Sequence, residues 1–360
     1  MNEPASHAPA WRAIATLYNA LVTALVVSLV ARRGADIARE YVFRHFRRQH
    51  LAKFLPGLRK LGLAGEPHAV ACALYHYHSN ALGGVKTEYC RESERKAWVR
   101  YPPPRWMWQG TAIAAIPHEV SAAMLHGWHG HNGVSLGNPR LGFVCTGMTV
   151  DGMPGLEGYY LEHDRPLAPE ARVRFAYGEE TMPPSDPAAA PKLDSASWPA
   201  ERLARARRNY AIDYVRTMLP VLQELLGAES AREELGRVAR LVGMQFFEQA
   251  ALESQSEASQ PFLEWLHTML AAQSEEAKLE MARGTWVLSL PRWRLIEGLA
   301  LSDPEGAFAA WNELWIGAGL ARDRFLRVET TRVLQDGALS VQWRTAVTSD
   351  NMVVPMQRSP

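Results

Sequence analysis

Three histidines lie close together in the stretch HGWHGHNG, at residues 126–133. His126 and His129 are spaced i, i+3, which places two imidazoles on one face of a helix. His131 follows Gly130, where the chain is free to turn back toward them. Three imidazoles with one position left for water are a ligand set typical of catalytic zinc or iron. We therefore predict that these histidines bind a divalent metal or act directly as acid and base. The alternative is a helix end at which histidines bond the last carbonyl groups.

Five other residues extend this predicted chemistry. His76 and His78 are expected to contact a ligand; on a helix they point about 200° apart, so only one of them can join the cluster, whereas on a strand they share a face. Cys145 is a candidate nucleophile if neighbouring histidines hold it as a thiolate, and a small buried apolar residue if they do not. Arg105 can clamp a carboxylate or stack on its neighbouring tryptophan, and Trp128 is expected at the same ligand site.

The overall composition narrows the class of protein. The chain has 360 residues, of which 47% are hydrophobic and 21% charged, so a substantial core is expected. A net charge of +1 gives no support to nucleic-acid binding, which needs a strongly basic face. The three cysteines form no CxxC pair, which argues against a thiolate zinc site and favours a reducing, cytoplasmic compartment. Twelve tryptophans suit a large core or a pocket for a flat, apolar ligand.

An uncharged apolar run extends from Ala13 to Ala31. Nineteen helical residues reach close to the roughly 30 Å thickness of the hydrocarbon layer of a membrane. Arg32 and Arg33 open a basic stretch that would hold the rest of the chain on the cytoplasmic face. The run therefore predicts either a membrane anchor or, because threonine, tyrosine and asparagine dilute it, a buried helix.

The chain also contains an internal repeat. Four blocks in the first half match four blocks in the second half in the same order, and the second and third blocks keep their separation. The residues shared by both copies are interpreted as scaffold. The matching pairs are FLPGLRKL (54–61) with MLPVLQEL (218–225), AWVRYPPPRW (97–106) with TWVLSLPRW (285–293), AAMLHGW (122–128) with AAWNELW (309–315), and FVCTGMTVDG (143–152) with RVETTRVLQDG (327–337).

These repeats predict an α+β fold in which two units pack as a pseudo-symmetric pair, preceded by the apolar helix. Each unit has helices, a short strand pair, a helix and a β-hairpin that turns at an Asp-Gly pair, Asp151-Gly152 and Asp336-Gly337. The predicted organisation is an apolar helix (1–33), a first repeat (34–177), a linker rich in proline and alanine (178–199), a second repeat (200–348) and a tail (349–360).

The histidines are not shared between the copies. His126 matches Glu313, His129 matches Ile316, and His131 has no counterpart. The fold therefore tolerates their loss, and we predict that the first repeat carries the active site while the second repeat supports it.

The layout, with its aromatic closing strands GLEGYYLEHD (155–164) and ALSVQWR (338–344), resembles the L-2-amino-thiazoline-4-carboxylic acid hydrolases and the related vinyl-reductase-type small-ligand domains. The resemblance implies a small-molecule site within each unit and, for the hydrolases, attack of water on a C=N carbon that opens a ring. No catalytic residue is carried over from it.

The function predicted first is therefore a hydrolase that acts on a C–N bond of a small cyclic molecule. Two alternatives stay open. One is a non-catalytic protein that binds or senses a small apolar ligand, and the other is a redox enzyme with histidine-ligated iron.

Overall fold

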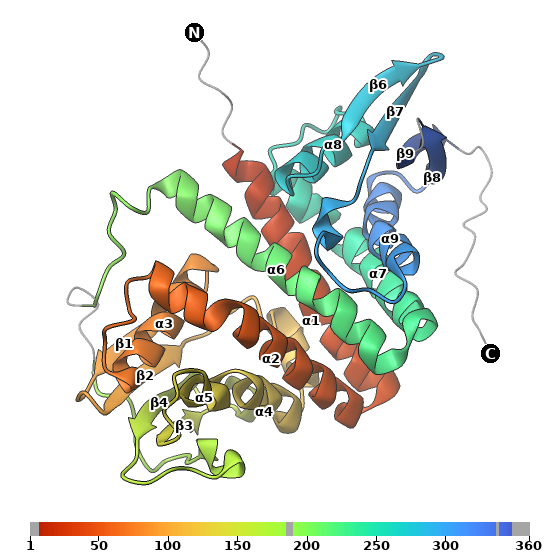
Figure 1. The fold of residues 1–360 in the computed structure, drawn as a ribbon. Coiled ribbons are helices and arrows are strands. Elements are labelled where there is room, and N and C mark those ends of the chain that lie inside the picture. The colour runs from red at the N-terminus through yellow and green to blue at the C-terminus, as the bar shows by residue number, and fades with distance from the viewer. Residues whose placement is uncertain (1–6, 185–189, 336–337, 348–360) are drawn as a thin grey trace. The chain divides into compact units, whose positions relative to one another are not determined.

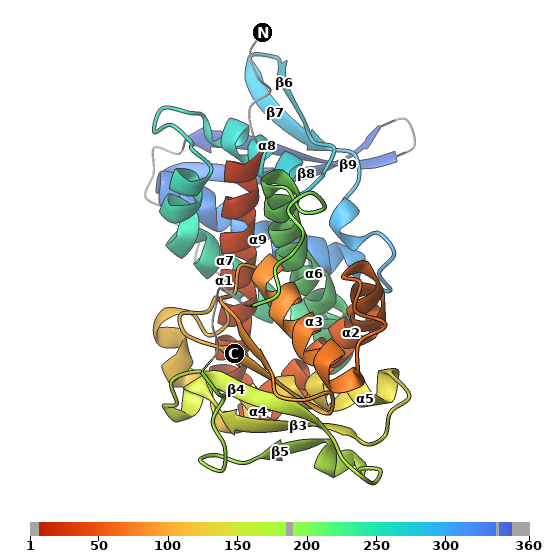
Figure 2. The same ribbon diagram turned by 90° about the vertical axis from the view of Figure 1, so that its left-hand side faces the viewer.

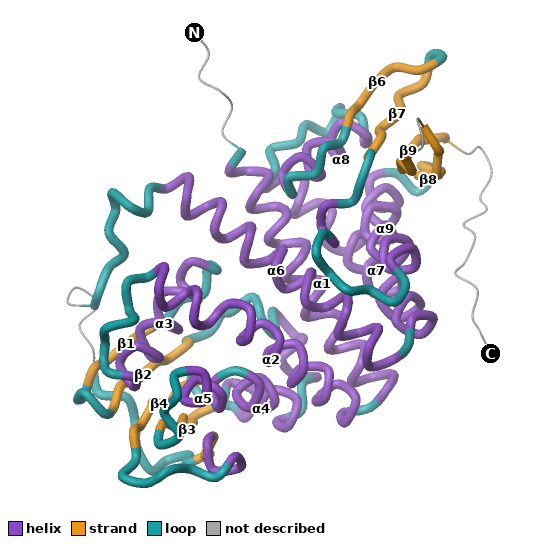
Figure 3. Tube along the Cα trace, in the orientation of Figure 1, coloured by secondary structure: helices purple, strands orange, loops and turns teal. Residues whose placement is uncertain are grey.

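The protein is described by a computed structural model that covers residues 7–184, 190–335 and 338–347. Its helices and strands are mixed along the chain (Figures 1 and 3), which confirms the predicted α+β class. The predicted turn at Asp336-Gly337 lies outside the described residues.

The chain divides into two compact units. The larger unit comprises Tyr18–Ala228 and Ala300–Ser302. The smaller unit comprises the described residues up to Leu17, Glu229–Leu299 and the described residues from Asp303 onward. These units differ from the predicted domain boundaries at two places. The apolar N-terminal helix is divided between the units, and the first long helix of the predicted second repeat belongs to the larger unit.

The larger unit is built from helices packed around α2, which contacts α3, α4 and α6. The chain enters α2 through Gly34, whose φ of +90° a side chain would disfavour. Its helices are α1 (Ala8–Arg33, from Tyr18 on), α2 (Ala35–Lys60), α3 (His68–Leu82), α4 (His118–Gly127), α5 (Asn132–Ser135) and α6 (Ala200–Leu226), with short 3-10 turns η1 (Gly110–Ala115), η2 (His129–His131), η3 (Thr149–Asp151) and η4 (Pro169–Arg172).

The sheet of the larger unit has the order β1-β2-β4-β3-β5, and Figure 2 shows β4, β3 and β5 side by side. Helix α3 packs on β2 and β4. The connection between β3 and β4 contains the predicted turn, where Gly152 has a φ of +79°. Buried Trp98 and Tyr159 pair across β2 and β4. The strands are β1 (Glu88–Arg91), β2 (Lys96–Tyr101), β3 (Leu141–Gly147), β4 (Leu156–Glu162) and β5 (Val173–Phe175).

The smaller unit has a sheet of order β6-β7-β9-β8, with α8 packed on β6, β7 and β9 and α9 on β8. Helix α9 begins at Pro304, where the missing backbone N–H costs no hydrogen bond, and the Asp303 carboxylate caps it by accepting a 2.8 Å hydrogen bond from the Gly306 amide. The elements are α7 (Ala228–Glu253), α8 (Phe262–Ala272), β6 (Lys278–Ala282), β7 (Thr285–Leu290), η5 (Arg294–Ile296), α9 (Pro304–Arg322), β8 (Leu326–Gln335) and β9 (Ala338–Val347).

The order of elements repeats along the chain. Apart from η2, α5, η3, η4 and β5, which have no counterpart in the second series, α1, α2, α3, β1, β2, η1, α4, β3, β4 is followed by α6, α7, α8, β6, β7, η5, α9, β8, β9. Without β5, the strand orders β1-β2-β4-β3 and β6-β7-β9-β8 also correspond. The two Pro-Arg-Trp sequences follow equivalent strands, β2 and β7. The two Leu-Pro sequences do not occupy equivalent helices, since Pro56 lies in the second helix of its series and Pro220 in the first. This order of elements agrees with an internal duplication, which stays a prediction.

Helix α1 contains the predicted apolar run. It is long and apolar enough to cross a membrane, with a mean hydropathy of 2.0 over its most apolar window, of which 72% is buried in the protein. Burial of this kind is typical of a core helix, and contact with a membrane stays a prediction.

Candidate functional site

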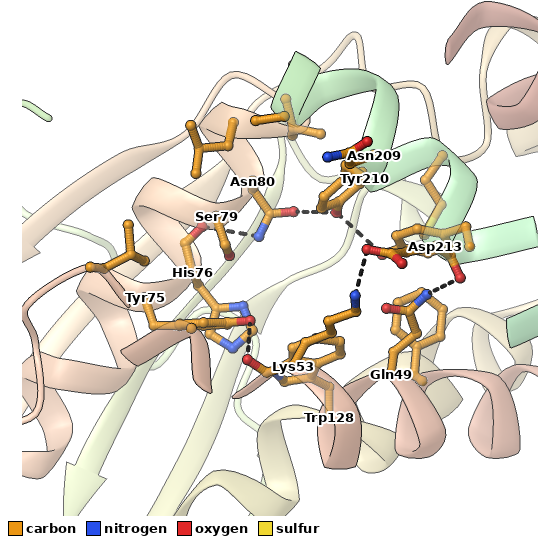
Figure 4. Close-up of a pocket in the computed structure, with 18 of the residues that line it drawn as sticks. Gln49, Lys53, Tyr75, His76, Ser79, Asn80, Trp128, Asn209, Tyr210 and Asp213 are labelled. Atoms are coloured by element: carbon orange, nitrogen blue, oxygen red, sulfur yellow. Dashed lines mark hydrogen bonds and ion pairs between the residues drawn. The ribbon is translucent and has the colours of Figure 1, made fainter. Parts of the chain in front are cut away.

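A cavity of about 450 Å³ lies within the larger unit. Its walls come from α2, α3, the turn after β2, the end of α4, and α6. Figure 4 shows labelled side chains of α2, α3 and α6, together with Trp128, arranged around the cavity. Most of the wall is aromatic or apolar, as expected for a small-molecule site. The aromatic and imidazole side chains that line it are Phe46, Tyr75, His76, Tyr101, Trp106, Trp128, His129, Trp198, Tyr210 and Tyr214.

Four of the predicted site residues line this cavity: His76, Arg105, Trp128 and His129. His76 and His78 lie on helix α3, so they diverge as the helical alternative predicts, and only His76 is part of the wall. The remaining predicted residues, His78, His126, His131 and Cys145, are not part of it.

His76 and His129 form a stacked pair, with ring centroids 4.0 Å apart and an angle of 13° between the ring planes. Behind them, the Asn132 amide donates to the Tyr160 hydroxyl (2.8 Å) and faces Nε2 of His76 (3.3 Å). The Tyr160 hydroxyl in turn lies 2.6 Å from Nδ1 of His129. Because the hydroxyl accepts from Asn132, it is free to donate to His129, whose remaining proton is then on Nε2. All four side chains are buried.

Burial disfavours the charged form of both imidazoles. Burial lowers the pKa of His129 to about 3, and it lowers the pKa of His76 well below its ordinary value, with a smaller contribution from the charge of His129. A general base works best with a pKa near the working pH. Neutral imidazoles with such low pKa values are poor bases and serve instead as flat, hydrogen-bonding wall groups.

The predicted metal ligands do not come together. Helix α4 ends at Gly127, and a separate 3-10 turn begins at His129, so His126 and His129 do not share the continuous helical face that their spacing predicted. Nδ1 of His131 lies 2.9 Å from the backbone carbonyl of His126, where it can donate, as the helix-end alternative expects. Across the described ranges, no three His, Cys, Asp or Glu side chains are grouped closely enough to hold a metal ion. The described residues therefore offer no ligand set for zinc or iron, and binding of either metal stays a prediction.

Cys145 lies on β3 and is completely buried. Its Sγ donates to the carbonyl of Gly147 (3.5 Å), and burial raises the pKa of the thiol to about 12. The side chain therefore stays a thiol at physiological pH, which favours the structural alternative over the nucleophile.

Helix α6 supplies a wall of the cavity that the sequence did not predict. Asp213 forms an ion pair with Lys53 on α2 (2.6 Å), and its backbone carbonyl accepts from Gln49 (2.9 Å). The Tyr210 hydroxyl lies 3.2 Å from that of Tyr214. The i, i+4 spacing of these two tyrosines marks a common helical face, but nothing local in the sequence indicates which helix that face meets.

Replacing Tyr160 with phenylalanine is expected to destabilise the larger unit by about 1–3 kcal/mol, because the buried Asn132 amide and His129 Nδ1 each lose a partner. Urea denaturation followed by fluorescence measures the change. The control is Tyr177→Phe, whose exposed hydroxyl bonds Asp151 and whose loss is expected to cost less than about 0.5 kcal/mol. Equal effects of the two substitutions would contradict this account of the network.

A comparison of the chain with protein-family models, with curated proteins and with solved structures finds no match.

Proposed function

We propose that the larger unit binds a flat, largely apolar small molecule in its cavity, and that binding rather than hydrolysis is the main function. The observation that carries the proposal is the 450 Å³ cavity with its aromatic wall. Its volume falls in the range that holds drug-sized ligands. The aromatic side chains offer faces and edges on which a planar ring system can stack.

The state of the side chains supports binding over the predicted hydrolase. The two histidines that reach the cavity are neutral and weakly basic, and Cys145 is a buried thiol outside it. Attack of water on a C=N carbon needs an effective base or a metal-bound hydroxide. The proposal therefore favours the binding or sensor alternative, with the hydrolase and the iron enzyme ranked below it.

The proposal is tested by filling the cavity. Ala206 on α6 lines it, and Leu203, one turn earlier on the same helix, is exposed and does not. N-phenyl-1-naphthylamine, a neutral fluorescent probe, is expected to bind the unmodified protein, and Ala206→Trp is expected to weaken its affinity by about tenfold or more because the new ring occupies the same space. Leu203→Trp should leave the affinity unchanged. Failure of the unmodified protein to bind the probe, or equal affinities in all three proteins, would overturn the proposal.

A further inference from the structure

We propose that the cavity is specific for an organic acid, and that Arg105 is the residue that binds the acid group. This inference rests on the proposed function and adds the chemical class of the ligand: a planar aromatic body that carries a carboxylate.

The position of Arg105 is the first observation. It follows β2 directly after a run of three prolines and lines the cavity. The side chain is partly exposed there. No nitrogen of its guanidinium is both fully enclosed and without a hydrogen-bond partner. Among the residues that the structure describes, Arg105 makes no hydrogen bond, ion pair or ring contact. A guanidinium has five N–H donors, so this leaves its full capacity available to a ligand.

The surroundings of Arg105 are neutral, which is the second observation. The phenols of Tyr101, Tyr210 and Tyr214 are its electrostatic neighbours. Burial raises the pKa of Tyr210 to about 12 and raises the pKa values of Tyr101 and Tyr214 well above the ordinary value, so all three keep their protons. Burial also lowers the pKa of Arg105, although a guanidinium stays charged at physiological pH. Without a counter-ion in the fold, the guanidinium donors are left to water, and a ligand carboxylate can replace that water with charge-assisted hydrogen bonds.

The corresponding arginine of the smaller unit provides an internal comparison. Arg292 stands in the second Pro-Arg-Trp sequence, after the equivalent strand β7. Its side chain is 55% exposed and lies 3.3 Å from Glu297 and 3.8 Å from Glu276. The motif therefore accepts an ordinary, paired surface arginine. Arg105 therefore lacks a partner because of its surroundings in the cavity, and not because of the Pro-Arg-Trp sequence itself.

The charge of the cavity wall is the third observation. Five cationic side chains line it, Lys53, Lys60, Arg105, Arg202 and Arg205, against a single carboxylate, Asp213, although the whole chain has a net charge of only +1. Asp213 is neutralised by Lys53. The remaining positive potential attracts anions toward the site. Two buried groups of the wall, the Tyr101 hydroxyl and Nε1 of Trp128, lack hydrogen-bond partners among the described residues, and both can donate to an acceptor.

The experiment compares biphenyl-4-carboxylate with biphenyl-4-carboxamide, which has nearly the same shape and no charge. Calorimetric titration of the full-length protein is expected to show the carboxylate binding about tenfold or more tightly than the carboxamide. Arg105→Met is expected to remove this preference by weakening the carboxylate alone. Arg292→Met, the matched control, should change neither affinity. Because Arg105 has no partner in the fold, Arg105→Met should not lower the melting temperature, which separates loss of a ligand contact from loss of structure.

The outcomes separate the two proposals. Equal binding of the two compounds, or an equal loss of both in Arg105→Met, would overturn the organic-acid inference while the cavity remains a binding site. If neither compound binds at about 1 mM, where even weak binding is measurable, the organic-acid inference is overturned, and the proposed function is overturned with it if N-phenyl-1-naphthylamine also fails to bind.

Discussion

Acidification from about pH 7 to pH 5 is expected to destabilise the protein by several kcal/mol and to bring it close to unfolding. The cause is a set of buried imidazoles that the fold keeps neutral. Burial lowers the pKa to about 3 for three of them and well below the ordinary value for the fourth. All four are no more than 5% exposed, and they are His45, His50, His76 and His129.

The direction of the effect follows from proton uptake. In the unfolded chain a histidine binds a proton near its ordinary pKa of 6.5. In the folded chain His45, His50 and His129 bind one only near pH 3, and His76 binds one only well below its ordinary pKa. Between these values the unfolded state holds more protons, so the free energy of unfolding falls as the pH falls below about 6.5. For each such histidine, the free energy of unfolding falls by about 1.4 kcal/mol per pH unit, which amounts to about 2 kcal/mol at pH 5. Four of them consume much of the roughly 5–15 kcal/mol by which proteins are stable.

Urea denaturation at pH 7, 6 and 5 measures this dependence. The substitution His45→Phe removes one of the four groups and is expected to reduce the slope of stability against pH by about a quarter in this range. Phe46→Leu, which replaces the buried ring beside His45 and removes no titratable group, is the matched control and should leave the slope unchanged. A free energy of unfolding that stays constant from pH 7 to pH 5, or a slope that His45→Phe does not alter, would contradict the neutral state of these imidazoles.

The second large effect is expected at the crossing of α7 and α9 in the smaller unit. A Cβ atom on Gly317 would lie 2.1 Å from the backbone oxygen of Arg240, and one on Gly243 would lie 2.0 Å from the backbone oxygen of Leu314. Neither oxygen can move without its helix. Gly317→Ala is therefore expected to lower the free energy of unfolding by about 3 kcal/mol or to prevent folding of this unit.

Gly236→Ala is the matched control on α7. Its Cβ would meet no atom closer than 3.5 Å, an ordinary contact, so the higher helix propensity of alanine should leave stability unchanged or raise it by up to about 1 kcal/mol. Thermal unfolding and solubility of the two variants measure the difference. If Gly317→Ala is as stable as Gly236→Ala, α7 and α9 do not approach each other as closely as described.

The sequence predicted the local features of the fold well because each has a local cause. The turn at Asp151-Gly152 lies where its residue types predicted it. The divergence of His76 and His78 follows from the helical period alone. The predicted helical face for His126 and His129 was wrong because α4 ends at Gly127, before the second of these residues.

The candidate site was harder to predict because long-range packing determines it. Lys53 and Asp213 are far apart in the sequence, and no pattern in either segment indicates that α2 and α6 meet. The histidine-rich segment suggested metal chemistry, yet the stack of His76 on His129 and the low pKa values arise from burial that only the tertiary fold supplies. Arg105 was identified as a candidate carboxylate clamp from its residue type, while its lack of a partner is visible only in the structure.

The central claim is that a planar organic acid binds in the cavity of the larger unit. A crystal structure of the protein with 4′-bromobiphenyl-4-carboxylate tests it most directly, because the anomalous signal of bromine locates the ligand without bias. We predict a bromine peak among the aromatic side chains of the cavity and a carboxylate within hydrogen-bond distance of the Arg105 guanidinium. A ligand bound only elsewhere on the protein, or one in the cavity with its carboxylate turned away from Arg105, would contradict the claim.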